Sequence, residues 1–429
     1  MKVLMFGWEF PPHISGGLGT ACYGLTKGLS KVPDLDVIFV VPKAFGDEEK
    51  DAVQIIGANE IPVIKKNFSI EGFMKDLNLV QVGVKLIPYL DPEEYRNYLI
   101  EQQQITGVTS ETENIGKLEF SGKYGPDLFR EISNYALVAS VLANQVEFDV
   151  IHSHDWLTYP AGIAAKLVSG KPLIVHVHAT DFDRSGGNVN PDVFAIEKQG
   201  MQMADKVITV SNLTRKIVIE KYEIDPAKVI TVYNAVEPVA IKENLVSDRP
   251  FNEKIVTFLG RITMQKGPEY FIEVANKVLQ RMDNVRFVMA GSGDMMNKMI
   301  ARAAKLKIMD KFHFTGFLSG DDVFRMFYMS DVYVMPSISE PFGISPLEAM
   351  QSNVPVIISH QSGVAEILNH AVKVDFWDIN AMADAIYGIL NYPALHTMFS
   401  KHGKIEVEGL KWETSALKVK EVYDMVYTS

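Results

Sequence analysis

The sequence predicts an α/β protein with two doubly wound parallel sheets that face each other across a cleft. Three observations support this prediction. Short runs of apolar and β-branched residues alternate with helical patterns, the runs are apolar throughout, and they form two series. Strands that are apolar on both faces are typical of a parallel sheet with helices on either side. A chain of 429 residues is also long enough for two or three domains.

The two series of expected strands divide the chain near its middle. The first series comprises residues 2–6, 36–41, 149–154, 172–178, 205–211 and 228–233. The second series comprises residues 254–260, 284–291, 311–316, 331–336, 354–359 and 371–376. Helices are expected between these strands, for example over residues 268–281, 320–329 and 379–391. Strands and helices that alternate in this way favour two successive domains built from βαβ units.

The boundary between two Rossmann-like domains is expected in residues 234–254, which are polar, contain two prolines and lack periodicity. The first domain is predicted to cover residues 1–240 together with about 411–429, because the Trp-containing last helix is expected to pack back across it. The second domain is predicted to cover residues 250–410. Residues 91–125 form another polar, irregular stretch, which we expect to be an insertion near a site in the first domain.

Composition narrows the class of protein. The chain is 47% hydrophobic and 22% charged, as in soluble globular enzymes. Its net charge of −11 argues against general binding to nucleic acid, where phosphate contacts dominate affinity. The single cysteine, Cys22, excludes an internal disulfide and fits a reducing cytoplasm. The first residues are expected to form a strand and not a signal peptide, and no apolar run reaches the roughly 18 residues that a membrane helix needs.

Glycines follow two of the expected strands, at the carboxyl edge where open α/β sheets bind ligands. Gly16 and Gly17 come after the first strand and precede an apolar helix. Glycine lets the backbone approach a ligand closely, and the first amides of a helix attract anions. A tight turn between strand and helix explains the same pair equally well. Ser292 and Gly293 follow a strand of the second series and offer amides to a nucleotide.

Histidines end two neighbouring strands of the first series. We expect His152 and His154 to belong to a polar strand end that lines the cleft, with Trp156 contacting a polar ligand. The alternative is that alternation buries one of the two histidines and exposes the other. We also expect His176 and His178 to point to opposite faces, with His176 in the core and His178 at the ligand edge. Asp155 is predicted to contact a polar ligand. No further metal ligands cluster near these residues in the sequence, so no metal site is predicted.

Two cations follow the first strand of the second series. Arg261 and Lys266 lie five residues apart in the segment "GRITMQKG". This pair suits a diphosphate, because Arg binds an anion at two points and Lys acts as a mobile point charge. A solvated basic loop is the alternative.

Two carboxylates flank a turn in the segment "PSISEPFGISPLEAM". Ser345 and Glu348 are expected to form a capping box at the start of a helix. That account leaves out Glu340 and Gly343. The amides of Gly343 and Ile344 and the helix start also offer an anion site. We therefore expect Glu348 to bind ribose hydroxyls and Glu340 to bind hydroxyls of a sugar.

Together these motifs resemble the retaining glycosyltransferases of the GT-B fold, in particular the glycogen and starch synthases. The motifs "GGLG", "HDWLT", "GRITMQKG" and "EPFGISPLE" carry the resemblance, which spans nearly the whole chain. The residues around the Gly pair and the segment "ATDFDRSGG" look more like the broader group 1 family, which includes sucrose synthases and mannosyltransferases.

The resemblance implies transfer of a hexose, expected to be glucose, from a nucleoside diphosphate sugar such as ADP-glucose or UDP-glucose. The acceptor would be a glucan or another glycan, and the reaction would retain configuration without a metal or other cofactor. The implied catalytic residues are His178, Arg261, Lys266 and Glu340. The implied donor-binding residues are Gly16, Gly17, Asp155, Ser292, Gly293, Phe317, Leu318, Phe342, Gly343, Ile344 and Glu348.

Several other functions stay open on the sequence alone. A group 1 enzyme could make another product, such as a surface polysaccharide or a glycolipid. A nucleotide-sugar epimerase would need no acceptor, and a phosphorylase would need pyridoxal phosphate bound to a lysine. A glycosidase also uses two carboxylates, but it would leave Arg261 and Lys266 unexplained. A sugar-binding protein without activity could keep the same fold.

Overall fold

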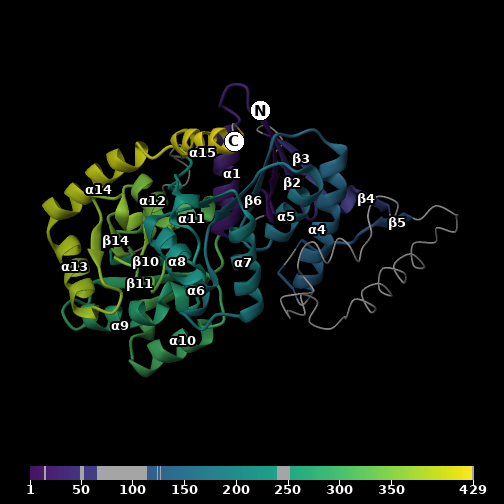
Figure 1. Cartoon of the computed structure of the whole chain (residues 1–429). Coiled ribbons are helices and arrows are strands. Elements are labelled where there is room, and N and C mark those ends of the chain that lie inside the picture. The colour runs from purple at the N-terminus through teal and green to yellow at the C-terminus, as the bar shows by residue number, and fades with distance from the viewer. Residues whose placement is uncertain are drawn as a thin grey trace.

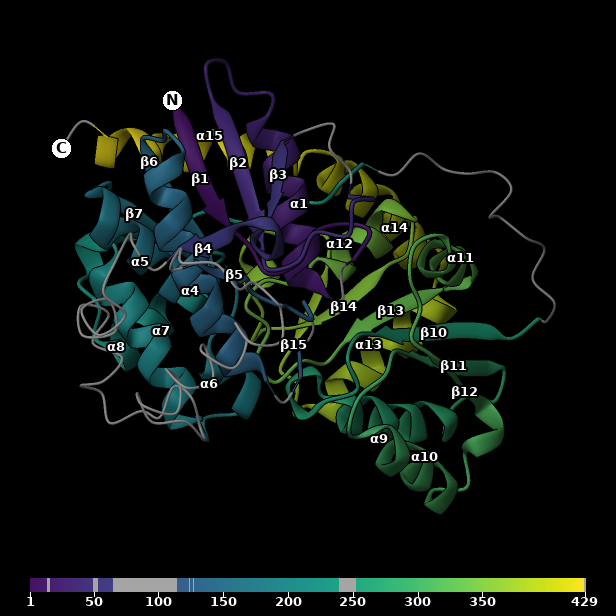
Figure 2. The ribbon, with the colours of Figure 1, turned by 90° about the vertical axis from the view of Figure 1, so that its right-hand side faces the viewer.

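The computed structural model describes residues 1–13, 16–48, 53–64, 114–122, 124–125, 127–238 and 252–427. Two parallel sheets, each with helices on both sides, make up most of this part of the chain (Figure 1). Figure 2 shows the sheets as two groups of strands, with β1, β2 and β3 in purple and β10, β11 and β12 in green. The predicted doubly wound α/β architecture is therefore confirmed.

The first sheet has the strand order β3-β2-β1-β6-β7-β8-β9 among the described residues, and its neighbouring strands run parallel. Its strands are β1 (Lys2–Phe6), β2 (Asp36–Val41), β3 (Gln54–Gly57), β6 (Val150–His154), β7 (Leu173–Val177), β8 (Lys206–Thr209) and β9 (Val229–Thr231). The expected strands are present, with ends that differ by up to two residues. The short edge strand β3 was not predicted.

The second sheet has the order β12-β11-β10-β13-β14-β15, again parallel. Its strands are β10 (Lys254–Leu259), β11 (Val285–Ala290), β12 (Phe312–Gly316), β13 (Val332–Met335), β14 (Val356–Ser359) and β15 (Val372–Val374). An antiparallel pair, β4 (Pro62–Ile64) with β5 (Asn114–Lys117), lies outside both sheets.

Helices connect the strands. The described helices between β1 and β9 are α1 (Gly17–Leu29), α4 (Leu128–Gln145), α5 (Tyr159–Ser169), α6 (Asp181–Ser185), α7 (Pro191–Met203) and α8 (Asn212–Tyr222). Those of the second sheet are α9 (Pro268–Leu279), α10 (Met296–Lys305), α11 (Asp321–Met329), α12 (Ser345–Gln351), α13 (Ile379–Asn391) and α14 (Pro393–Glu408), and α15 (Trp412–Tyr427) comes last. Short 3₁₀ turns include η5 (Met264–Lys266) and η7 (Gly363–Glu366). Within the described ranges, none of the helices is both long enough and apolar enough to cross a bilayer.

Buried apolar side chains lie on both faces of each sheet. In β1, Leu4 and Phe6 belong to the core under α4, whereas Val3 and Met5 belong to the core under α1 and α15. Strands β6 and β7 are buried along their whole length. Their side chains are therefore enclosed on both faces, as the uninterrupted apolar runs predicted.

The last helix lies against the first sheet, although it follows the second sheet in the chain. Helix α15 packs on α1 (Figure 1), where Gly24 and Gly28 face Trp412. A Cβ atom at Gly24 would lie 2.2 Å from the indole ring, so this close approach requires glycine. On the same helix, the Tyr423 hydroxyl lies 2.7 Å from His152 Nδ1. Residues 411–427 therefore belong to the core of the first sheet.

Two segments singled out in the sequence lie mostly outside the described residues. The structure does not describe residues 239–251 of the expected boundary segment, nor residues 91–113, 123 and 126 around the expected insertion. In the described remainder of that stretch, residues 114–117 form β5.

Each sheet reverses its strand order at one point near its centre. The reversal falls between β1 and β6 in the first sheet, and between β10 and β13 in the second. The loops after such a pair of strands diverge and leave a crevice, where open α/β sheets bind ligands. The loops after β10 and β13 carry Arg261, Lys266 and Glu340. The loops after β1 and β6 carry Gly16, Gly17 and Asp155.

Candidate active site

Lys266 and Glu340 form an ion pair where the loops after β10 and β13 meet. Lys266 ends the η5 turn, and its Nζ lies 2.6 Å from Glu340 Oε2. Ser337 donates a further hydrogen bond to the same oxygen, at 3.2 Å. Gly267 has φ +67°, and a Cβ there would lie 2.0 Å from the Pro336 carbonyl oxygen. Only glycine allows the two loops to touch, so the backbone itself sets the Lys266–Glu340 distance.

The backbone of Glu340 is held from a third loop. Its amide donates to the Gln361 carbonyl and its own carbonyl accepts from the Gly363 amide, both at 2.9 Å. The Val364 amide donates to the Phe342 carbonyl at 2.8 Å. The loop after β13 is therefore bound to the loop after β14, which fixes the backbone position of Glu340.

Arg261 has a cationic side chain that the fold does not neutralise. In the part of the chain that the structure describes, it forms no ion pair, and its one side-chain contact is Nη2 to Gln265 Oε1 at 3.5 Å. The side chain is exposed. An exposed, unpaired guanidinium beside the crevice is available for an anionic ligand.

Three successive amides in the loop before α12 also lack acceptors. Within the described residues, the N–H groups of Phe342, Gly343 and Ile344 donate to no protein oxygen. Gly343 has φ +104°, a conformation that glycine adopts at little cost. Consecutive free amides of this kind form a concave anion-binding surface. Sequence analysis placed these residues at the ligand, and their geometry suits that role.

The predicted capping box at the start of α12 is wrong. Ser345 is the first helical residue, and the preceding Ile344 caps the helix without a side-chain hydrogen bond. The Ser345 hydroxyl instead pairs with the Tyr333 hydroxyl at 2.8 Å. A tertiary partner from the neighbouring strand β13 thus competes with the local motif. Glu348 is left with no side-chain hydrogen bond to any described residue, and burial raises its pKa to about 7.

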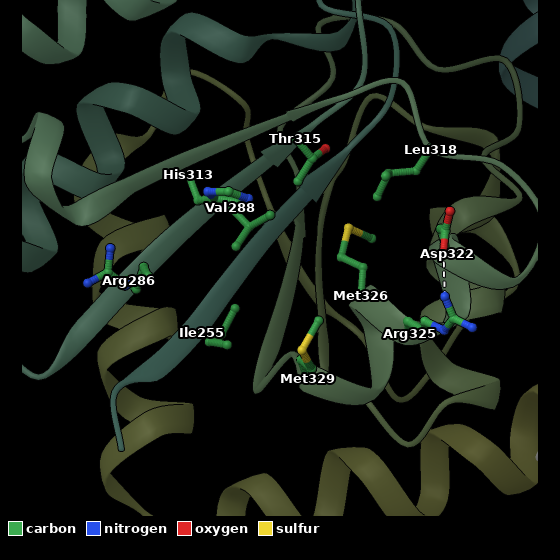
Figure 3. A pocket seen from close by; sticks show the side chains of 10 residues that line it. All are labelled: Ile255, Arg286, Val288, His313, Thr315, Leu318, Asp322, Arg325, Met326 and Met329. Atoms are coloured by element: carbon green, nitrogen blue, oxygen red, sulfur yellow. Dashed lines mark hydrogen bonds and ion pairs between the residues drawn. The ribbon is translucent and has the colours of Figure 1, made fainter. Parts of the chain in front are cut away.

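Four other residues that were expected to bind the donor fall into two groups. Ser292 and Gly293 lie beside Ile262, and a Cβ at Gly293 would come within 2.4 Å of the Ile262 carbonyl oxygen. This glycine is therefore required for packing, whatever else it does. Phe317 is 61% exposed, whereas Leu318 points into an apolar cavity of about 590 Å³ (Figure 3).

That cavity lies between α11 and strands β10 to β12. Its lining consists of Ile255, Arg286, Val288, His313, Thr315, Leu318, Asp322, Arg325, Met326 and Met329 (Figure 3). None of the four predicted catalytic residues lines it. The cavity is thus separate from the loops that hold the cations.

The glycine pair at the start of α1 has no packing role among the described residues. A Cβ at Gly16 or Gly17 would meet no atom of those residues within 4 Å, and neither glycine has a left-handed φ. The tight-turn interpretation therefore does not explain why glycine stands at these positions. Open space over the backbone fits close approach by a ligand.

For the histidines of the first sheet, the predicted burial of His176 is confirmed, whereas the prediction that His176 and His178 point to opposite faces is wrong. His152, His154 and His176 are all buried, and His176 and His178 stack with ring centroids 4.4 Å apart. Residues two apart on a strand point to the same face, and β6 pairs with β7 so that His154 lies beside His176. The four rings therefore gather on one face. Desolvation lowers the pKa of the first three well below the ordinary value and that of His178 to about 4, so all four are neutral at pH 7.

In this histidine cluster, possible metal-binding atoms from separate segments of the chain lie close together. Nitrogen atoms of His152, His154 and His176 lie within 4.8 Å of one another, and Cys22 approaches His154 and His178 in the same way. The ring planes, however, lie within 5–36° of each other. Nitrogen lone pairs lie in the ring plane, so stacked rings do not aim them at one point. The geometry gives no reason to assign a metal here.

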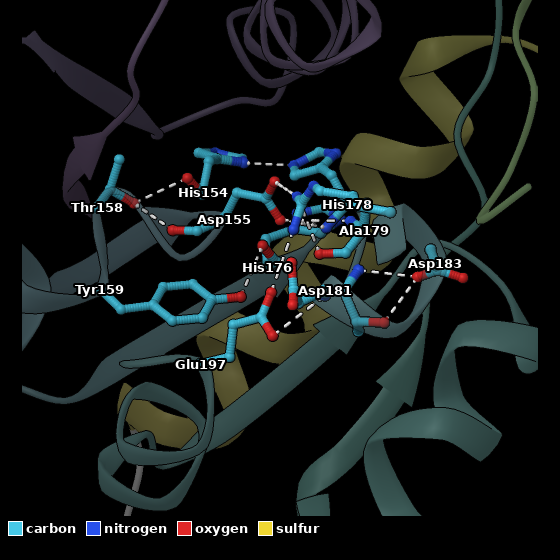
Figure 4. Close-up of polar contacts among 12 residues, drawn as sticks. His154, Asp155, Thr158, Tyr159, His176, His178, Ala179, Asp181, Asp183 and Glu197 are labelled. Carbon is cyan, nitrogen blue, oxygen red and sulfur yellow. Dashed lines mark hydrogen bonds and ion pairs between the residues drawn. The ribbon is translucent and has the colours of Figure 1, made fainter. Parts of the chain in front are cut away.

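Asp155 was predicted to contact a polar ligand, and in the structure both of its carboxylate oxygens bond to protein groups. Its Oδ1 accepts hydrogen bonds from the amides of His178 and Ala179, at 3.2 and 3.3 Å (Figure 4). Its Oδ2 lies 2.6 Å from Arg184 Nη2. Asp155 therefore holds the loop that follows β7, and through that loop His178.

The two domains meet where these loops converge. Asp183, on α6, accepts a hydrogen bond at Oδ1 from the Ser339 hydroxyl, at 2.5 Å. Helix α6 also packs on the η5 turn, where a Cβ at Gly186 would lie 2.5 Å from Met264 Cε. The loop that carries His178 thus touches both segments that carry Lys266 and Glu340.

Sequence analysis missed four residues of this arrangement. Asp183 and Arg184 stand in the quoted segment "ATDFDRSGG", and Ser339 directly precedes Glu340, so their positions were a usable signal. Glu197 lies within helix α7, where nothing in the local pattern distinguishes it from a solvated side chain.

The chain is similar in sequence to known glycosyltransferases. Residues 242–406 match the family described as glycosyl transferases group 1, and residues 111–239 match glycosyltransferase family 4. An uncharacterized glycosyltransferase of Methanocaldococcus jannaschii is 29% identical over 87% of this chain and 84% of its own length. A glycogen synthase of Mycobacterium tuberculosis is 23% identical over 99% of this chain and 94% of its own length.

A solved structure supports the fold. Sucrose-phosphate synthase from Thermosynechococcus elongatus superposes with a TM-score of 0.72 at 18% identity, over 100% of this chain and 99% of that one. At this identity the likeness speaks for the fold alone. The two family matches together span well over half of the sequence. The chain therefore belongs to the group 1 glycosyltransferases and has the GT-B fold.

Proposed function

We propose that this protein transfers a hexose, with glucose as the first candidate, from a nucleoside diphosphate sugar to a glucan or another glycan. The observation that carries the proposal is the set of groups around the strand reversal of the second sheet. Within the described residues, Arg261 without an ion pair, the Lys266–Glu340 pair and three amides without acceptors all lie on the loops after β10 and β13. Cations and amides suit a diphosphate, and a carboxylate suits sugar hydroxyls.

The chemical step breaks the bond between the anomeric carbon and a diphosphate oxygen. Negative charge grows on that oxygen, and groups preorganised there lower the barrier most. In this proposal Arg261 and Lys266 neutralise the departing diphosphate, with the amides of residues 342–344. The diphosphate competes with Glu340 for Lys266, which leaves the Glu340 carboxylate to hydroxyls of the sugar. This distribution of charge needs no divalent metal, so activity should survive EDTA.

The first sheet would supply the other wall. His178, neutral because desolvation lowers its pKa to about 4, would lie by the transferred sugar as a hydrogen-bonding group and not as a cation. The free backbone at Gly16 and Gly17 would admit the diphosphate. Transfer with retention requires the acceptor hydroxyl to attack from the face that the diphosphate leaves. Contact between α6 and the η5 turn would exclude water during that step.

The test is release of nucleoside diphosphate from ADP-, UDP- and GDP-sugars, with and without glycogen or maltooligosaccharides. We expect release from ADP-glucose or UDP-glucose that depends on the glucan, with measurable chain growth. Release that needs a different acceptor would keep the enzyme in the family but replace the glucan. Conversion of the donor without any acceptor would support an epimerase. No turnover with any donor would overturn the proposal and favour a sugar-binding protein.

A further inference from the structure

The backbone of the segment from His178 to Asp183 is held by buried carboxylates, which accept hydrogen bonds from its successive amides. Asp155 accepts from His178 and Ala179, and Asp183 accepts from Thr180 at 2.8 Å. Glu197, from helix α7, accepts from Asp181 at 3.2 Å (Figure 4). The conformation of this loop thus depends on where these carboxylates lie.

A single guanidinium connects two of these carboxylates. Arg184 donates through Nη2 to Asp155 Oδ2 at 2.6 Å and through Nη1 to Glu197 Oε1 at 3.2 Å. Nη2 also reaches the Ala179 carbonyl at 3.2 Å. The side chains of Asp155 and Glu197 are only 5% and 3% exposed. Two carboxylates this deeply buried would repel each other and lose solvation without a shared cation.

Asp155 has an uncommon backbone conformation, which its hydrogen-bond partners hold in place. Asp155 has φ +63°, a left-handed conformation that is uncommon for residues other than glycine. Its bonds to two amides and one guanidinium account for the persistence of that conformation. Burial also raises the pKa of Glu197 to about 7, and the charge of Arg184 counteracts this rise. Removing Arg184 would therefore favour protonation or displacement of Glu197 at neutral pH.

We propose that Arg184 is a positioning residue that sets the place of His178 at the crevice by clamping Asp155 and Glu197. The inference rests on the proposed glycosyl transfer, since it assigns His178 to the sugar side of that reaction. Arg184 itself touches no reacting group in this account. Its planar guanidinium can reach both carboxylates and a carbonyl at once, whereas a lysine ammonium is a compact point charge.

The test compares Arg184→Ala and Arg184→Lys with the wild-type enzyme, using donor turnover and amide hydrogen exchange. The matched control is Arg302→Ala, which removes an arginine on α10 from a partly exposed ion pair with Glu273 on α9. We expect kcat of Arg184→Ala to fall about 100-fold with a smaller change in KM, because a small displacement of a positioned group has effects of that size. Arg184→Lys should be intermediate, and Arg302→Ala unchanged.

Two further readouts separate positioning from general stability. Guanidinium at millimolar concentration should restore part of the lost kcat in Arg184→Ala, whereas sodium chloride at matched ionic strength should not. Hydrogen exchange should quicken in residues 178–183 and stay unchanged in the second sheet. Unchanged kcat and exchange would overturn the proposal, and so would exchange that quickens across the whole chain without guanidinium rescue. If the wild-type enzyme turned over no donor, the proposed function would fail, while local exchange would still decide the role of Arg184.

Discussion

The loops at the carboxyl edges of the two sheets satisfy their polar groups in opposite ways. At the first sheet, Asp155, Arg184 and Glu197 bind one another and the backbone beside them. At the second sheet, Arg261 has no ion pair, and Glu348 has no side-chain hydrogen bond within the described part of the chain. The first edge is a prearranged scaffold, and the second leaves charge and amides for a ligand.

Lys266→Ala removes the cation that is positioned by the contact between the loops after β10 and β13. We expect kcat to fall about 100- to 1,000-fold, the range found when one preorganised electrostatic group is lost from an active site. Nucleoside diphosphate release measures the effect. The control is Lys298→Ala, which removes a lysine from an exposed pair with Glu269. If both variants kept full turnover, the second edge would not be the charged wall of the site.

Gly17→Ala asks whether open space over the backbone serves a ligand. No atom of the described residues lies within 4 Å of the added Cβ, and alanine favours the first turn of a helix, so the free energy of unfolding should change by less than about 1 kcal/mol. Donor turnover should nevertheless fall, by about tenfold, because the methyl group keeps the diphosphate from the amide. Thermal denaturation and donor kinetics give the two readouts. A stable variant with normal kinetics would remove Gly17 from the site.

Glu348→Gln should stabilise the ligand-free protein while it weakens donor binding. Burial raises the pKa of Glu348 from 4.5 to about 7, so the folded state holds this proton more tightly than the unfolded state does. The contribution of Glu348 to stability is therefore most favourable below pH 4.5 and declines as the pH rises through about 7. Glutamine does not ionise, so the stability of the variant does not decline for this reason.

For that variant we expect a gain of about 1–3 kcal/mol in the free energy of unfolding at about pH 8, and little gain at about pH 5. The KM for the donor should rise, because an amide replaces an acceptor of ribose hydroxyls. Urea denaturation at both pH values and donor kinetics are the measurements. A stability gain that did not depend on pH would show that ionisation of Glu348 is not its cause.

Ser339→Ala removes the hydrogen bond that joins the two edges, with a small expected effect. Asp183 keeps its bonds to Thr180 on Oδ2, so the first loop stays folded. The free energy of unfolding should fall by about 1 kcal/mol or less, and KM should rise about two- to fivefold, in line with one hydrogen bond. The control is Ser400→Ala on α14, whose hydroxyl bonds only within its own helix. An effect on kcat as large as that of Lys266→Ala would mean that the contact does more than join the edges.

Most of the fold could be predicted from the sequence, because it follows from local patterns. Uninterrupted apolar runs are confirmed as strands of two parallel sheets. The loops after β10 and β13 were singled out from charge and glycine placement, and Lys266 and Glu340 do lie together. Whether a residue follows the end of a strand is a local property of the sequence, so it can be predicted without knowing which other residues lie nearby in the fold. The short strands β3, β4 and β5 were missed, because runs of three or four residues carry little pattern.

The order of strands and helices, the family resemblance and the strand ends at which we expect the chemistry all follow from the amino-acid sequence. The partners of individual side chains depend on how the chain folds. The pairing of β6 with β7 brings His154 beside His176, and Tyr333 takes the hydroxyl that was expected to cap α12. Glu197 reaches Arg184 from another helix. Hydrogen bonds and ion pairs form between the polar groups that folding brings within about 3 Å of each other, and those groups are distant in the sequence.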